Sequence, residues 1–93
     1  MPTYPKVIQV ANVAPAATRE QMKTLFGYVG RIDDIEIYPE KETGNLLTRV
    51  CYVKFYDSED AGVALHLTNT VFIDRALVVT PVPENRYWYN SNI

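Results

Sequence analysis

The chain has 93 residues, of which 47% are hydrophobic and 22% charged, with a single cysteine and a net charge of −2. This length and composition predict one globular domain with one core, and the lone cysteine excludes a disulfide framework and fits a reducing compartment. The charge excludes a strongly basic surface, and we find neither an apolar run of membrane-spanning length nor a signal-peptide pattern.

The first predicted element is a short strand. Val7–Val10 is rich in β-branched residues, and alternation places Ile8 and Val10 toward a core and Gln9 and Ala11 on the opposite side. We expect residues 1–5 to be a lead-in, because prolines there remove ladder donors.

A helix should follow this strand. Thr18 and Gln21 fit a capping box at its start, and Gly30 is a natural C-terminal stop. Between them, apolar residues recur at helical spacing: Met22, Leu25, Phe26 and Val29.

Two further strands are predicted, joined by a polar, glycine-containing loop over residues 40–45. In the first of them Ile32, Ile35 and Ile37 mark the core side, and Glu36 and Tyr38 mark the other side.

The next strand, Arg49–Phe55, has the clearest alternation in the chain. Its core side should carry Cys51, Val53 and Phe55, and its other side Val50, Tyr52 and Lys54. An aromatic ring and a cation on an uncovered face suit a flat, negatively charged polymer.

The remainder predicts a second helix, a short extended piece at residues 71–73 and a last strand. Asp57 or Ser58 should cap that helix, whose buried stripe is Ala61, Ala64 and Leu65 or Leu67. The last strand is expected over Ala76–Thr80, with Leu77 and Val79 buried and Val78 and Thr80 on the open side; Pro81–Pro83 should stop it.

This order, βαββαβ, predicts an α+β ferredoxin-like fold, with a four-stranded antiparallel sheet and two helices on one face. Right-handed crossovers place the first and third strands in the middle. Gln9 and Tyr52 should then be neighbours at the centre of the open face, flanked by Tyr38 and Thr80.

The residue types exclude most other chemistries of such a fold. One cysteine and one histidine cannot form a metal site of the usual coordination number, and residues 11–18 lack the glycines of a phosphate-binding loop. No catalytic triad can be assembled with His66 alone. We therefore expect no enzyme, no metal, no cofactor and no small-molecule substrate.

Two stretches resemble the signature of the RNA recognition motif. Thr48–Phe55 is similar to its eight-residue ribonucleoprotein motif, K/R-G-F/Y-G/A-F-V-x-F/Y, and Ile8–Val13 to the companion motif on the first strand. The similarity covers residues 6–82, and phrases such as Gln21–Phe26 and His66–Phe72 resemble the SR-related splicing regulators of the glutamate/lysine-rich type. Residues 83–93 are then a tail.

The resemblance implies binding of single-stranded pre-mRNA in the nucleus, but the stacking residues are incomplete. Tyr52 is present, whereas Val50 and Gln9 occupy positions where the family carries rings, and Arg49 stands where glycine is expected. Losing two stacked bases at ~1–3 kcal/mol each predicts weak binding, with Tyr52 stacking and Lys54 and Arg49 supplying charge.

The alternative is a protein-interaction module that binds other splicing factors. The near-neutral charge and the apolar residues Val50 and Val78 of the open face favour it. The Arg-x-Phe sequence with which some related domains hold a partner tryptophan is only partly kept, as Thr70–Phe72. The tail segment Arg86–Tyr89 either folds back over the open face, packs at the domain edge or is disordered.

Overall fold

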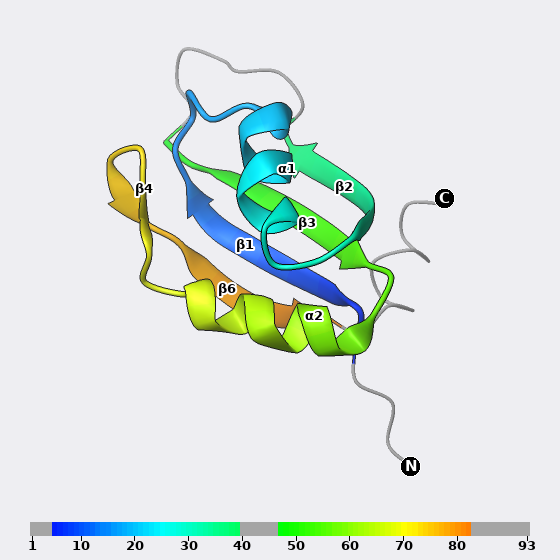
Figure 1. Cartoon of the computed structure of the whole chain (residues 1–93). Helices are drawn as coiled ribbons and strands as arrows, with labels where there is room; N and C mark the ends of the chain where they lie inside the picture. Colours follow the sequence, from blue (N-terminus) through cyan, green and yellow to red (C-terminus); the bar gives the residue numbers. More distant parts are fainter. Residues whose placement is uncertain (1–4, 40–46, 83–93) are drawn as a thin grey trace.

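The computed structural model describes residues 5–39 and 47–82 and has the predicted architecture. Four antiparallel strands form one sheet in the order β2-β3-β1-β6, and both helices lie on the same face (Figure 1). The elements, in chain order, are β1 (Val7–Val13), α1 (Arg19–Gly27), β2 (Ile32–Tyr38), β3 (Arg49–Phe55), α2 (Ser58–Ala64), the 3-10 turn η1 (Leu65–Leu67), β4 (Val71–Phe72), β5 (Arg75–Ala76) and β6 (Val78–Val82).

The start of α1 confirms the predicted capping box. The backbone N–H of Gln21 donates to the Thr18 hydroxyl at 3.1 Å, and the Gln21 side-chain oxygen accepts from the Thr18 N–H at 2.9 Å. These bonds satisfy two donors that a helix start leaves without partners. Met22 and Phe26 are the residues that α1 buries.

The prediction that Gly30 ends α1 is wrong. The helix ends at Gly27 with Tyr28 as C-cap, and no described glycine has a positive φ. Gly30 instead lies against Asp60 of α2, whose side chain a Cβ at position 30 would overlap. Glycine is needed there for close approach of the α1–β2 connection to α2.

The registers of the central strands explain the apolar spacing of the sequence. Gln9 of β1 lies opposite Tyr52 of β3, as predicted. The β2–β3 register shifts between Ile32 and Asp34, which accounts for the odd three-residue step from Ile32 to Ile35. After this bulge the alternation is regular.

The C-terminal half differs from the prediction in two places. Residues 71–76 form a small hairpin of β4 and β5, and Leu77 follows it as a fully buried residue. Strand β6 continues through Pro81, which pairs with Ile8, to Val82. Proline is tolerated there because β6 is an edge strand, whose outward side needs no ladder donor.

The main core lies between the sheet and the helices. The predicted inward residues Cys51, Val53 and Phe55 are fully buried in it. A second, smaller cluster lies on the other face, where Val7 and Val82 are buried and Tyr52 packs against them. The Tyr52 ring therefore has an apolar support on one side.

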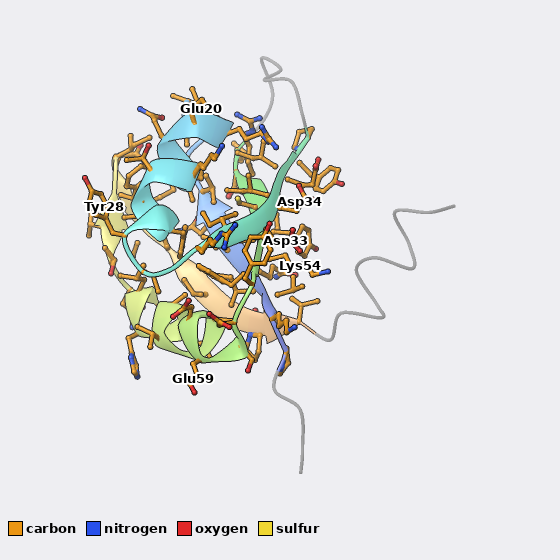
Figure 2. The ribbon with its side chains drawn as sticks, turned by 45° about the vertical axis from the view of Figure 1, so that its right-hand side comes forward. Glu20, Tyr28, Asp33, Asp34, Lys54 and Glu59 are labelled. Atoms are coloured by element: carbon orange, nitrogen blue, oxygen red, sulfur yellow. The ribbon has the colours of Figure 1, made fainter. Side chains whose placement is uncertain are left out.

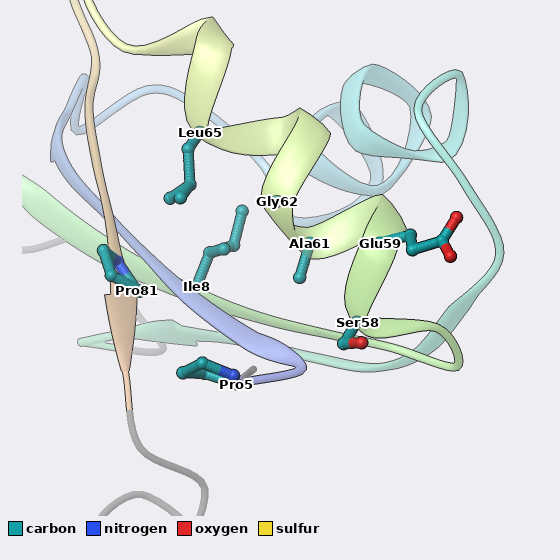
Figure 3. Close-up of a pocket in the computed structure, with 8 residues that line it drawn as sticks. All are labelled: Pro5, Ile8, Ser58, Glu59, Ala61, Gly62, Leu65 and Pro81. Carbon is teal, nitrogen blue, oxygen red and sulfur yellow. The ribbon is translucent and has the colours of Figure 1, made fainter. Parts of the chain in front are cut away.

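A cleft of about 360 Å³ opens between α2 and the neighbouring ends of β1 and β6 (Figure 3). It is lined by Pro5, Ile8, Ser58, Glu59, Ala61, Gly62, Leu65 and Pro81. Since α2 forms one wall, this cleft lies on the helix side of the sheet, away from Tyr52.

Candidate nucleic-acid interface

Tyr52 lies at the centre of the sheet face that the helices leave open. Its hydroxyl donates to the side-chain oxygen of Gln9, 3.2 Å away on β1. The Tyr38 ring meets it edge-on from β2, with 6.0 Å between the ring centroids and 66° between the planes. These contacts hold the partly exposed Tyr52 ring in place.

The other residues predicted for the open face lie on it as expected. Thr80 is opposite Gln9, and Val50 is opposite Tyr38. Thr80 and Tyr38 are exposed, and Val50 and Gln9 are half-buried. The four residues lie around Tyr52, one on each strand of the sheet.

The charge of this face is less favourable to phosphate than the sequence suggests. Lys54 lies opposite Asp34, and its ammonium group is 3.8 Å from the carboxylate of Asp33 (Figure 2). Glu36 lies directly opposite Tyr52. The β2 side of the face therefore has carboxylates beside the cation that was expected to attract RNA.

Arg49 is not on the open face, which corrects the expectation that it supplies charge there. Only 6% of the residue is exposed. Its guanidinium donates to the carbonyl of Pro39 at 2.9 and 3.2 Å, to that of Pro15 at 3.2 Å and to that of Ala17 at 2.7 Å. Alternation along β3 explains this position, because Arg49 shares the side of Cys51.

Cys51, on the core side of β3, is the free cysteine of the described residues and is buried. Burial raises the pKa of Cys51 to about 12, so its thiol stays protonated at neutral pH.

Across residues 5–39 and 47–82, no group of three or more His, Cys, Asp or Glu side chains is placed to hold a metal ion. No helix in this part of the chain is long and apolar enough to cross a membrane. The tail segment Arg86–Tyr89 lies outside the described residues.

Comparison with known families identifies the class. Residues 8–78 match the RNA recognition motif family, and this chain belongs to that family. Domains of this family are non-catalytic binding modules, so this domain is a binding module and not an enzyme.

Similar curated proteins narrow the class further. Serine/arginine-rich splicing factor 11 of Homo sapiens is 54% identical over 80 residues, which cover 85% of this chain and 16% of that protein. The probable splicing factor, arginine/serine-rich 7, of Caenorhabditis elegans is 39% identical over 93 residues, covering 92% of this chain and 21% of that protein. The chain thus spans about a fifth or less of the length of these two relatives.

Solved structures support the fold alone. The RRM of RNA15 superposes with a TM-score of 0.78 at 17% identity, covering 90% of this chain and 97% of that one. The third RRM of Pes4 gives a TM-score of 0.75 at 23% identity, and the match covers 83% of this chain and 90% of that one.

Glu36 is a residue of the candidate interface that the predicted site lacked. The sequence places Glu36 on the open face, but from β2 only Tyr38 was expected to lie beside Tyr52. Glu36 occupies the directly opposite position, and Tyr38 reaches the ring from the diagonal one. The Ile35–Ile37 alternation fixes the face, whereas the register across β2 and β3 has no signal in the sequence.

Proposed function

We propose that this domain is the RNA-binding module of a nuclear pre-mRNA splicing regulator and that it binds single-stranded RNA weakly on its open face. The observation that carries the proposal is the position of Tyr52. A ring that is held by Gln9 and Tyr38 on the sheet face that the helices leave open offers a π-face to a base. The similarity to serine/arginine-rich splicing factors supports the splicing context.

Weak binding follows from what surrounds the ring. Val50 and Gln9 offer no aromatic surface, and each missing stacked base removes ~1–3 kcal/mol of binding free energy. Lys54 has the carboxylate of Asp33 close by, and Arg49 is buried on the helix side. Affinity therefore rests mainly on one stacked base and on few phosphate contacts.

The test is an NMR titration of the chain and its Tyr52→Ala variant with short single-stranded RNA. We expect Tyr52→Ala to weaken binding about tenfold, in the range that one stacked base contributes. Tyr52→Phe should keep near-normal affinity, because it keeps the aromatic ring and loses the hydroxyl that bonds to Gln9.

Tyr28 provides a matched control. It is 86% exposed at the end of α1, on the side of the molecule away from Lys54 (Figure 2). Tyr28→Ala should leave affinity unchanged. Binding that survives Tyr52→Ala intact would contradict the stacking role.

A protein-interaction module is the second candidate, and the charge of the open face favours it. Asp34 and Glu36 oppose phosphate, while Val50 and the 44% exposed Val78 offer apolar contact area. In that case short RNAs produce no saturable shifts at Tyr52, and a splicing-factor partner does.

A further inference from the structure

Glu36 lies where a base stacked on Tyr52 would meet the β2 side of the interface. The two residues are directly opposite each other in the β2–β3 ladder. Side chains in such pairs have Cβ atoms about 5 Å apart, so the Glu36 carboxylate can reach the edge of a base that is stacked on the tyrosine ring. Both residues are partly exposed.

The two sides of Tyr52 differ in hydrogen-bonding character. On the β1 side, the side-chain oxygen of Gln9 already accepts the Tyr52 hydroxyl at 3.2 Å. On the β2 side, Glu36 has no ion pair or side-chain hydrogen bond among the described residues. An ionised carboxylate accepts hydrogen bonds and cannot donate them.

We propose that Glu36 is a specificity-determining residue, which favours a base with an exocyclic amino group on its Watson–Crick edge over uracil. The amino group of cytosine donates to a carboxylate, whereas the O4 of uracil is an acceptor that the carboxylate repels. This inference rests on the proposed function, because it needs a base on Tyr52.

A substitution of Asp34 can distinguish base selection by Glu36 from a general effect of negative charge on the open face. Asp34 is on the same strand and face as Glu36, but it lies opposite Lys54, two positions along the ladder from the Glu36–Tyr52 pair. Its carboxylate also accepts the Ile35 N–H at 2.8 Å. Asp34→Asn removes one negative charge from the face and leaves the position beside Tyr52 unchanged.

The experiment measures the affinity of the chain for oligocytidine and oligouridine of equal length, which differ at the reading edge of the base. We expect the unmodified chain to prefer oligocytidine about fivefold, the lower end for one specific contact at a half-exposed position. Glu36→Gln should bring this ratio close to unity, because its amide both donates and accepts. Asp34→Asn should strengthen binding to both RNAs and keep the ratio.

The outcomes separate this inference from the proposed function. Equal affinity for the two RNAs, or a ratio that Glu36→Gln does not change, overturns the specificity role while Tyr52-dependent binding stands. Binding that is insensitive to Tyr52→Ala, or absent with both RNAs, overturns the proposed function and this inference with it.

Discussion

Arg49 uses its charged side chain to bind backbone carbonyls from other segments of the chain. Its guanidinium joins the start of β3 to the carbonyls of Pro15 and Ala17 before α1 and to that of Pro39 after β2. Of these hydrogen bonds, only the one to Ala17 is buried, and those to Pro15 and Pro39 are partly buried, where water can replace the lost donor. A buried carbonyl left without its charged donor costs ~1–3 kcal/mol, and the partly buried ones cost less.

Arg49→Met should therefore lower the free energy of unfolding by about 2–4 kcal/mol, measured by urea denaturation. RNA affinity of the folded variant should stay near normal, because the side chain is on the helix side of the sheet. The matched control is Arg19→Met, at an exposed arginine with a single bond to the Ile35 carbonyl at 3.0 Å. If Arg49→Met instead kept its stability and lost RNA affinity, the result would contradict this structural role and support a phosphate contact by Arg49.

The residue scale also shows where sequence reasoning reaches its limit. Period-two alternation correctly placed Tyr52 on one face and Cys51 on the other. The same alternation places Arg49 beside Cys51, but the motif resemblance suggested a phosphate contact for it. A buried arginine is recognisable only once the carbonyls around it are known, and these come from distant segments of the chain.

At the scale of the elements, Gly30 allows the connection between α1 and β2 to lie close against Asp60 of α2. A Cβ at position 30 would overlap the Asp60 side chain, including its Cβ. Gly62 is a helical glycine of α2, and a Cβ there meets nothing within 4 Å. Replacement by alanine should therefore change the stability of the domain in opposite directions at the two glycines.

Gly30→Ala should destabilise the domain by ~1–3 kcal/mol, because α2 or the α1–β2 connection must shift. Gly62→Ala should stabilise it by ~0.5–1 kcal/mol, since alanine restricts the unfolded chain and favours helix. Thermal denaturation of both variants makes the comparison. A neutral Gly30→Ala would show that Asp60 moves aside at no cost.

Local signals predicted the elements better than their ends. The capping box fixed the start of α1 because both partners are three residues apart in the sequence. The role of Gly30 depends on Asp60, thirty positions later, and the extension of β6 through Pro81 depends on β6 being an edge strand. Both are properties of the assembled fold.

At the scale of the whole molecule, strand order was predictable and register was not. The βαββαβ order and right-handed crossovers lead to the observed β2-β3-β1-β6 sheet. The bulge between Ile32 and Asp34 then decides which β2 side chain lies opposite Tyr52. That position is held by Glu36, so the open face has a carboxylate beside its central ring.

This charge distribution predicts an unusually shallow salt dependence of RNA binding. Each phosphate contact on single-stranded nucleic acid contributes a slope of about −0.7 in log K against log salt. Of the two cations predicted for the open face, Lys54 lies on it and Arg49 is buried on the helix side, so we expect one or two phosphate contacts and a total slope of about −0.7 to −1.4. Lys54→Gln should bring the slope toward zero, while Lys23→Gln, at an exposed lysine of α1, should leave it unchanged. A slope steeper than about −3 would require several further phosphate contacts and would contradict a weakly charged interface centred on Tyr52.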